Sequence, residues 1–510
     1  MNYTIGMTGA SLVSGLNTDF LALYSGKAKN AADYGFLPSA SATANTAALN
    51  ALLLGGYKSI FIPYGEYNVN DSLIFDDYTS LVAELGTKFI KTAAFMPLFM
   101  NRGLITKTYN THILIDGITV EDSYGIGASQ YGLGAIMGFW WIKNLIVKNY
   151  TCLVDAYSLG FITAKFENVI FDNINLKGEK AGINFTNGHD AIVTNYTIES
   201  FDDGGVCAAV GYPQFFIEAG DCYNITFRNC VDKLPTSWAD VGGQFHRLCS
   251  ASWKDWTTGY TYITGDLCLN AGHLYQCNNA TNFTGTGTVA PTHTTGQVTG
   301  ADGIIWRYKN DTSVYHYDVW NITFDNIISE RNRNVFWSNL CSDTGYVRLA
   351  YPGTEALSSV YNISVINCNR DYSNTSSFIK NDGNLRDVRV ANNTFNGLSL
   401  FYQNQRDDVA FASTLKIALT GNIFKNQSTG IGILSKLNAE AIEIQSAGNI
   451  CETCDFVFTP TNGATMRLNG IDLKVRNGQI GNLTPAIGDM INYVNGTYIY
   501  KAGGWVNLAV

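Results

Sequence analysis

A short pattern that recurs along the chain decides the fold. It reads LIVKNYTC (145–152), VIFDNINL (169–176), NITFRNCV (224–231), NITFDNII (321–328) and NISVINCN (362–369). Apolar and polar residues alternate in each copy, as in a β-strand, and an Asn stands where the strand would turn. Related copies are ILIDGITV, IVTNYTIE, VRVANNTF and IALTGNIF, at 113–120, 192–199, 388–395 and 417–424.

The Asn or Gly of each copy serves as a marker of the repeat length. The markers stand at positions 117, 149, 173, 195, 229, 326, 367, 392 and 421, with spacings of 32, 24, 22, 34, 97, 41, 25 and 29 residues. Short spacings fit one coil of a solenoid, and longer ones fit coils with inserted loops. Strands that recur once per coil stack in parallel. We therefore expect an all-β, right-handed parallel β-helix with stacked turn Asn side chains. An antiparallel sandwich with accidental similarity is the alternative.

A solenoid needs its open ends covered, and the sequence offers a candidate at each end. TANTAALNALLLGG (43–56) has Ala and Leu at helical spacing, which predicts a short helix before the first strand. NGTYIYKAGGWVNLAV (495–510) predicts a small β-hairpin. The expected organisation is an N-terminal cap segment (1–42), a first β-helix part (43–250), an inserted small β module (251–311), a second β-helix part (312–455) and a C-terminal β cap (456–510).

Composition limits the possible functions. The 510 residues are 13% aromatic and only 15% charged, which suits a β-rich protein. A net charge of −9 argues against a nucleic-acid partner, and no apolar run is long enough to predict a membrane span or a signal peptide. The 11 cysteines favour buried free thiols. Cys451 and Cys454 form a lone CxxC that predicts no metal site, and no cofactor is expected.

Two stretches of the chain resemble known families. AADYGF (31–36), with NTAALNALL and KSIFIPYGEYNV after it, resembles the N-terminal segment of the pectate-lyase-like β-helix superfamily, found in bacteriophage tailspikes and polysaccharide-degrading enzymes. The string NVIFDNINLKGEKAGINFTNGHDAIVTNYTIESFDDGGVCAAV (168–210) is similar to polygalacturonase-type glycoside hydrolases, whose paired aspartates match Asp202 and Asp203. This sequence departs from that family at Ala181, where the family has an aspartate. The family's Gly-His-Gly motif is not recognisable in this sequence either.

The architecture as a whole most resembles a phage tailspike depolymerase. That resemblance implies a homotrimer on the virion that cuts bacterial capsular or O-antigen polysaccharide at the host surface. It also implies attachment to the phage tail or baseplate through a part that this chain lacks. The apolar run FWWI at 139–142 separately predicts lateral self-association.

Carboxylates gather at similar distances, six to eight residues, after the markers. Residues at equal offsets in stacked coils lie above one another, about 4.8 Å apart per coil. Asp202 and Asp203 follow Asn195 by seven and eight residues, and Glu179 follows Asn173 by six. Glycoside hydrolysis uses two carboxyl groups separated by roughly 5 to 9.5 Å, and crowding should raise the pKa of at least one. We predict Asp202 as the general acid, a role that the resemblance implies, with Asp203 or Glu179 as base. A plain Asp-Asp-Gly-Gly turn is the alternative.

Other side chains suit a sugar ligand. Arginine pairs with carboxylates in bidentate fashion, so SERNRNVFWSN (329–339) predicts contacts to an acidic sugar unless it is a solvated turn. His189 beside Asp190 is either a base or a satisfied loop pair. The predicted substrate-binding residues are Arg331, Arg333, Trp337, Tyr157, His189 and Glu330. Loops that hold Glu218, Asp221, Asp240 or Glu330, and a site shared between subunits, remain alternative locations.

The 97-residue gap between markers contains a separate unit of about 60 residues. Its pattern of Gly-Asp, Tyr-x-Cys, Pro and Asp-Gly before a Trp resembles small carbohydrate-binding modules of the chitin-binding type. Exposed aromatic rings stack on sugars, so we predict Trp253, Trp256 and Tyr275 as sugar-binding residues. Trp306 is expected in the module's own core.

Three functions are consistent with the sequence. The leading hypothesis is an endo-acting glycosidase that hydrolyses a bacterial surface polysaccharide. A polysaccharide lyase on the same fold would use Lys180, Tyr157 or Arg333 as the base and release an unsaturated sugar. A non-catalytic spike would only bind glycan.

Overall fold

The computed structural model shows two compact units, which are described separately here. Unit 1 consists of Met1–Val206, Asn224–Gly243 and Phe324–Arg331, and unit 2 of Cys207–Tyr223, Gln244–Thr323 and Asn332–Val510. The structure describes residues 28–94, 97–124, 135–154, 159–209, 220–233, 244–252, 254–263, 266–280, 283–311, 316–329, 334–341, 359–371, 377–398, 400–404, 414–426, 431–435, 441–452, 455–460, 465–475, 483–485, 489–493 and 496–508.

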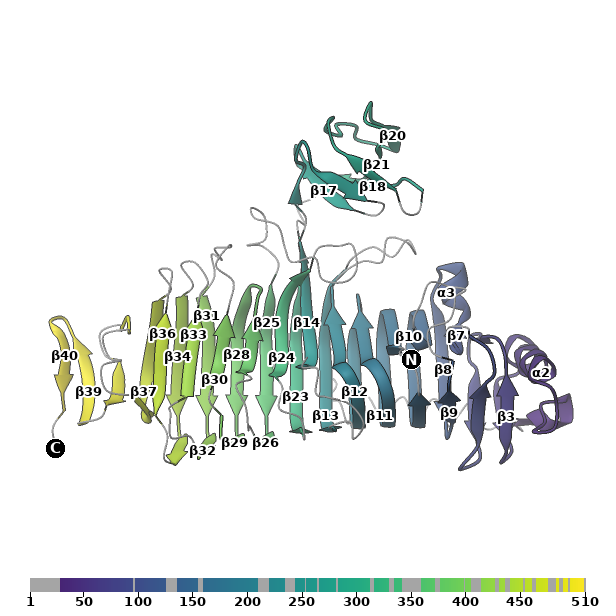
Figure 1. The fold of residues 1–510 in the computed structure, drawn as a ribbon, viewed down its shortest axis with the longest axis horizontal. Coiled ribbons are helices and arrows are strands. Elements are labelled where there is room, and N and C mark those ends of the chain that lie inside the picture. Colours follow the sequence, from purple (N-terminus) through teal and green to yellow (C-terminus); the bar gives the residue numbers. More distant parts are fainter. Residues whose placement is uncertain are drawn as a thin grey trace. The chain divides into compact units, whose positions relative to one another are not determined.

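Unit 1 stacks its strands in three parallel columns (Figure 1). The first column holds β2 (Ser59–Ile62), β5 (Ser80–Ala83), β8 (Asn110–Asp116) and the middle parts of β10 (Ala135–Val154) and β11 (Leu159–Thr186). The second holds β3 (Glu66–Val69), β6 (Lys88–Lys91), β9 (Thr119–Asp122) and the ends of β10 and β11. The third holds β4 (Leu73–Phe75), β7 (Phe99–Asn101) and the starts of β10 and β11.

Unit 2 repeats the three columns. The first holds β25 (Val360–Ile366), β28 (Leu385–Ala391), β31 (Thr414–Thr420), β34 (Ala441–Ala447) and β37 (Thr465–Val475). The second holds β26 (Asn369–Asp371), β29 (Thr394–Asn396), β32 (Ile423–Lys425) and β35 (Ile450–Glu452). The third holds β14 (Gln244–Ser252), β24 (Asn334–Cys341), β27 (Ser377–Asn381), β30 (Leu400–Asn404), β33 (Ile431–Ser435) and β36 (Phe456–Pro460).

The predicted fold class is therefore confirmed: the chain is an all-β, right-handed parallel β-helix, and the sandwich is excluded because the columns pair in parallel. The remaining long strands are β12 (His189–Ala208), β13 (Cys222–Asp232) and β23 (Val319–Ser329). All nine marker residues have positive φ, between 51° at Asn149 and 82° at Gly117. Asn and Gly tolerate this left-handed conformation better than other residues, which explains why they mark the bends.

Side chains at the bends also stack as expected. In unit 1, Asn173 Nδ2 donates to Asn149 Oδ1 at 2.8 Å, and Asn326 Nδ2 donates to Asn229 Oδ1 at 2.9 Å. Sequence analysis missed a second series of positive-φ residues, each five positions before a marker. This series consists of His112, Asn144, Asn168, Asp190, Asn224, Asn321, Asn362 and Asp387.

Aromatic side chains fill the interior of unit 1. Tyr150, for example, contacts Phe99 and Phe161, with ring centroids 6.3 and 5.1 Å away. The run at 139–142 belongs largely to this interior, because Phe139, Trp140 and Ile142 are at most 1% exposed. These three side chains are therefore not available for the predicted lateral association.

The predicted N-terminal helix is present as α2 (Ala42–Leu54), after β1 (Lys29–Asn30) and a short 3-10 helix at Ala31–Tyr34. Ser41 caps α2, because its Oγ accepts from Ala44 N at 3.2 Å. Buried Leu49 and Leu53 anchor the helix, and Asn50 bonds to Ser72 O and Ile74 N at 2.8 Å each. The helix thus lies against the first coil.

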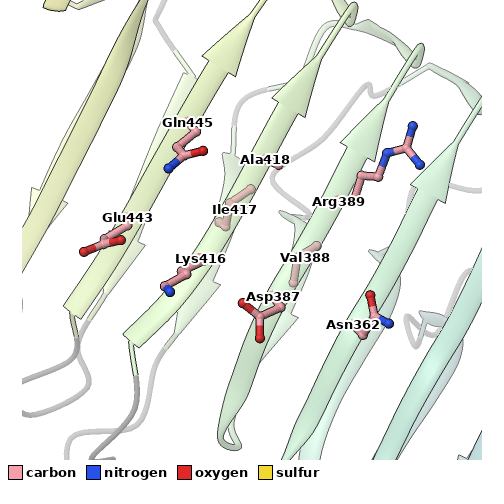
Figure 2. Close-up of a pocket in the computed structure, with 9 residues that line it drawn as sticks. All are labelled: Asn362, Asp387, Val388, Arg389, Lys416, Ile417, Ala418, Glu443 and Gln445. Carbon is pink, nitrogen blue, oxygen red and sulfur yellow. The ribbon is translucent and has the colours of Figure 1, made fainter. Parts of the chain in front are cut away.

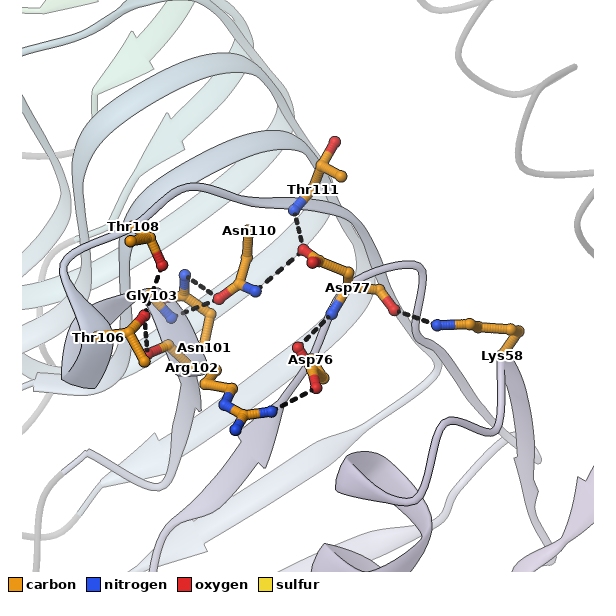
Figure 3. A network of polar contacts seen from close by, with 10 residues as sticks. All are labelled: Lys58, Asp76, Asp77, Asn101, Arg102, Gly103, Thr106, Thr108, Asn110 and Thr111. Atoms are coloured by element: carbon orange, nitrogen blue, oxygen red, sulfur yellow. Dashed lines mark hydrogen bonds and ion pairs between the residues drawn. The ribbon is translucent and has the colours of Figure 1, made fainter.

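A second short helix, α3 (Arg102–Thr106), is held by the polar network in Figure 3. Arg102 Nη1 donates to Asp76 Oδ2 at 2.9 Å, and Asp77 Oδ1 accepts from Asn110 Nδ2 and Thr111 N at 3.0 and 2.7 Å. Asn110 Oδ1 in turn accepts from the Gly103 amide. These carboxylates join neighbouring coils of unit 1, which is a structural role.

No helix in the described part of the chain is long and apolar enough to cross a membrane.

The coils extend beyond the boundary expected at residue 455. β36 and β37 still pair in parallel with the preceding coil, and β38 (Met490–Tyr493) pairs in parallel with β37. A glycine with the earlier pattern does stand there, Gly470 in MRLNGIDL (466–473), and its φ is positive, but the sequence prediction did not include it. The predicted C-terminal hairpin is present as β39 (Gly496–Lys501) and β40 (Gly504–Asn507), which pair antiparallel.

The strands between Lys254 and Asp311 form sheets of their own within unit 2. The larger sheet contains β15 (Lys254–Asp255), β17 (Leu267–Asn270), β18 (His273–Cys277), β20 (Gln297–Thr299) and β21 (Ile305–Asp311). The smaller one pairs β16 (Thr261–Ile263) with β19 (Thr284–Thr286). The short strand β22 (His316–Tyr317) pairs antiparallel with the end of β14 and returns the chain to the coils.

The described cysteines are free thiols, as predicted. Eight of them are buried and Cys451 is half-buried. Burial raises the pKa of Cys207 well above its ordinary value, and a hydrogen bond with Cys222 adds to the shift. Such thiols stay neutral at neutral pH and pack as small apolar side chains. Within the described residues, no group of three His, Cys, Asp or Glu side chains is arranged to hold a metal ion.

Candidate functional site

The predicted acidic residues lie on consecutive coils of unit 1. Glu179 belongs to β11, and Asp202 and Asp203 belong to β12. Asp203 is only 4% exposed. The side chains of Glu179 and Asp202 lie outside the described part of the structure, whereas the backbone on either side of them is described.

The two coils are in register before these residues. Asn195 Nδ2 donates at 2.8 Å to Asp172 Oδ1, which precedes the marker Asn173. Four residues after the two markers, Lys177 Nζ and Glu199 Oε1 form an ion pair at 3.7 Å. Equal offsets therefore correspond to neighbouring positions up to two residues before Glu179.

The same coils are in register again after these residues. Gly182 and Gly204 both stand nine residues after their markers, and a Cβ at Gly182 would lie 2.2 Å from Gly204 O. Tyr196 Oη donates to Gly204 O at 2.9 Å and would lie 1.9 Å from that same Cβ. The backbones approach so closely that only glycine fits at position 182.

These contacts bracket the predicted acid and base. Segments 177–182 and 199–204 have equal length, and both of their ends are adjacent. The two segments therefore run side by side about one coil spacing apart, roughly 4.8 Å. One carries Glu179 and the other carries Asp202 and Asp203.

His189 and Asp190 form a pair in which each side chain is about one third exposed. His189 Nδ1 lies 2.9 Å from Asp190 Oδ2, and the side-chain exposures are 32% and 37%. Partial burial raises the pKa of Asp190, but hydrogen bonds from His189 and from Asn224 Nδ2 outweigh it and hold the pKa below its usual value. Because Asp190 also belongs to the second positive-φ series, the pair has a structural role at a bend; substrate binding by His189 stays a prediction.

Other predicted residues cannot be placed with their side chains. Trp337 belongs to β24, where its backbone pairs with Arg247 and Lys380, and its side chain lies outside the described part. The remaining predicted residues outside the described part are Tyr157, Glu330, Arg331, Arg333 and Trp253.

The inserted module uses its aromatic residues mainly for its core. Tyr275 is 0% exposed, and its Oη donates to His293 O at 2.8 Å. A fully buried ring has no free face for a sugar, so the structure places Tyr275 in the core rather than among exposed sugar-binding rings. Trp306 is 1% exposed, as expected, and the half-buried Trp256 packs against the same cluster.

Unit 2 carries a hollow that the sequence analysis did not anticipate (Figure 2). It has a volume of about 210 Å³ and lies on the exposed face of β25, β28, β31 and β34. Its polar lining residues are Asn362, Asp387, Arg389, Lys416, Glu443 and Gln445. These residues come from four coils, so their proximity depends on register rather than on local sequence.

Sequence comparison gives no relative: no family model matches the chain, and no curated protein matches it. Solved structures show distant similarity. The tailspike protein of E. coli bacteriophage HK620 is 11% identical, with 93% of this chain and 79% of that chain covered and a TM-score of 0.48. A surface adhesin of Streptococcus pneumoniae is 12% identical, with coverages of 95% and 99% and a TM-score of 0.44. For a family 28 exopolygalacturonase of Yersinia enterocolitica the identity is 15%, the coverages 86% and 80%, and the TM-score 0.42. At these identities the likeness concerns the fold alone.

Proposed function

We propose that the protein is a polysaccharide depolymerase that hydrolyses glycosidic bonds with a pair of carboxylates on adjacent coils. In this proposal Asp202 is the general acid and Glu179 or Asp203 activates water. The bracketed register of segments 177–182 and 199–204 supports it, because it places the backbone that carries Glu179 roughly one coil spacing from the backbone that carries Asp202 and Asp203.

The burial of Asp203 favours Glu179 as the base. A general base must reach the water or hydroxyl whose proton it takes, and Asp203 is only 4% exposed. Glu179 would then replace the aspartate that polygalacturonase-type hydrolases carry at the position of Ala181. Asp203 would help to hold the bend.

The finer part of the proposal concerns biology. By its sequence resemblance, the protein would be a homotrimeric phage tailspike that binds and cuts capsular or O-antigen polysaccharide at the bacterial surface. The acidic net charge of −9 is compatible with such an extracellular glycan-directed role and offers no basic surface for nucleic acid.

The proposal is tested with Asp202→Asn, which keeps the side-chain shape and removes the acid. Release of reducing ends from a panel of bacterial capsular and O-antigen polysaccharides should fall by roughly 10²- to 10⁴-fold, the usual contribution of a general acid. Asp33→Asn is the matched control, because Asp33 is exposed and lies in the N-terminal 3-10 helix; it should cleave like wild type.

The other outcomes identify the alternatives. Full activity of Asp202→Asn would remove Asp202 as the acid. A product with the ultraviolet absorbance of an unsaturated uronate would replace hydrolysis by elimination, with Lys180 as the nearest candidate base at the offset of Asp202. Binding of a polysaccharide that wild type never cleaves would mean a non-catalytic spike.

A further inference from the structure

The hollow on unit 2 has a simple structural origin. One row across the coils contains Arg389, Ala418 and Gln445, which are partners in successive parallel pairings. The small Ala418 between two long side chains leaves a depression (Figure 2). The next row contains Lys416 paired with Glu443, with Asp387 on the preceding strand. The depression is thus bordered by charged side chains of both signs.

The border charges are available for a ligand. Among the residues that the structure describes, none forms an ion pair or hydrogen bond with the side chains of Asp387, Arg389 or Lys416. Glu443 has only a 3.7 Å contact with Arg467, whose guanidinium makes two shorter hydrogen bonds, at 2.6 and 2.7 Å, to Asp489. Asn362 Nδ2 already donates to Asn321 Oδ1, but the charged groups around the hollow retain most of their hydrogen-bonding capacity.

A stack of aromatic rings includes residues that precede two lining residues in sequence. The rings of Tyr223, Trp320 and Tyr361 stack with centroids 4.3 and 5.7 Å apart and interplanar angles of 3° and 6°. The Arg386 guanidinium covers the end of this stack, 4.8 Å from the Tyr361 ring centroid. Asn362 and Asp387 directly follow Tyr361 and Arg386 in sequence, so two of the lining residues are next to members of this stack.

We propose that this hollow binds a single acidic sugar residue, separately from the carboxylate pair of unit 1. Arg389 and Lys416 would hold the sugar carboxylate, because a guanidinium pairs with a carboxylate through two hydrogen bonds. Asp387, Glu443, Gln445 and Asn362 would bind its hydroxyl groups. A hollow of about 210 Å³ has room for roughly seven water molecules at about 30 Å³ each, which is enough for one sugar ring. The inference rests on the proposed function only in taking the ligand to be a sugar.

The test measures binding of free glucuronate and of glucose to the full chain by isothermal calorimetry. Glucuronate should bind in the millimolar range and glucose about tenfold more weakly or worse, because glucose lacks the carboxylate. Ala418→Leu, which fills the hollow, and Arg389→Ala should each weaken glucuronate binding by about tenfold or more. Thr420→Leu adds the same side chain at an exposed position of the same strand, outside the lining, and should bind like wild type.

The outcomes separate this inference from the depolymerase proposal. Equal binding of the two sugars, no binding of glucuronate, or unchanged binding by Ala418→Leu and Arg389→Ala would each overturn the inference. A protein that binds glucuronate in the hollow and cleaves no polysaccharide would keep the inference and overturn the hydrolase. Cleavage that depends on Asp202 without glucuronate binding would do the reverse.

Discussion

Coils of unit 1 and the later coils of unit 2 form the same bend in different ways. In unit 1 the marker asparagines, such as Asn149 and Asn173, are exposed, and the next residue is apolar and buried, as at Tyr150 and Ile174. In unit 2 the positive-φ position at 421 is glycine, and the following Asn422 points inside the coil with 0% exposure. The side-chain amide stack is therefore outside the coil at Asn149 and Asn173 of unit 1 and inside it at Asn393, Asn422 and Asn449 of unit 2, although unit 2 also has exposed amide contacts such as Asn426 to Asn396.

The inner stack carries more hydrogen bonds per residue. Asn422 Nδ2 donates to Val390 O and Asn449 Oδ1 at 2.9 and 2.8 Å, and its Oδ1 accepts from Asn393 N and Nδ2 at 3.0 and 2.9 Å. Asn173 in unit 1 has one bond, to Asn149 Oδ1. Because buried polar groups lose more when a partner is removed than exposed ones, the inner stack should dominate the stability of its bend.

The largest effect is expected for Asn422→Ala. The substitution leaves Val390 O, Asn393 N and parts of two amides without partners in the interior, which should cost about 3 kcal/mol. Hydrogen–deuterium exchange should therefore accelerate by roughly 100-fold in residues 388–396 and 414–426. Unchanged protection in both segments would show that the inner stack adds little to the bend. Exchange in segment 110–122 of unit 1 provides the internal control.

A smaller loss is expected for Gly421→Val. Residue 421 has φ of +64°, and a Cβ there would lie 2.8 Å from Asn392 Oδ1. A β-branched residue in the left-handed region costs about 1–2 kcal/mol. Gly421→Asn is the matched control, because Asn tolerates this conformation and would place an amide beside Asn392 as in unit 1. A thermal midpoint that falls equally for both variants would mean that position 421 requires glycine because of crowding and not because of its backbone conformation.

Much of the fold is predictable from sequence because the bend chemistry repeats. Each marker must adopt positive φ, so Asn or Gly recurs at the coil period, and the alternation of apolar residues fixes which side faces the core. The coil beyond 455 was not predicted, although Ile444 and Leu468 pair across coils and the positive-φ glycines Gly448 and Gly470 follow them. The second positive-φ series was readable in NITF and NISV, where an Asn precedes each strand segment.

The sites are less predictable. The alternation shows that Arg389, Ala418 and Gln445 point outward, but a solvated face has the same pattern. Their hollow exists only because residues 29 and 27 positions apart are paired across coils. To predict it, that register must be known with an accuracy of one residue. For the acidic pair, Gly182 and Gly204 stand at equal offsets from their markers, so the register of the two coils could be read from the sequence. Only the structure shows why both are glycine, because their backbones approach closely.

The smallest loss, about 1 kcal/mol, is expected for Asn173→Ala in unit 1. This variant loses one exposed hydrogen bond and places alanine at a φ of +53°. Asn173→Gly separates the two contributions, because glycine relieves the backbone and loses only the bond, so it should cost about half as much. Both are measured as shifts of the thermal midpoint at one scan rate, beside Asn422→Ala. If Asn173→Ala destabilises as strongly as Asn422→Ala, the outer stack supports its bend as much as the inner one, and burial does not decide the difference between the units.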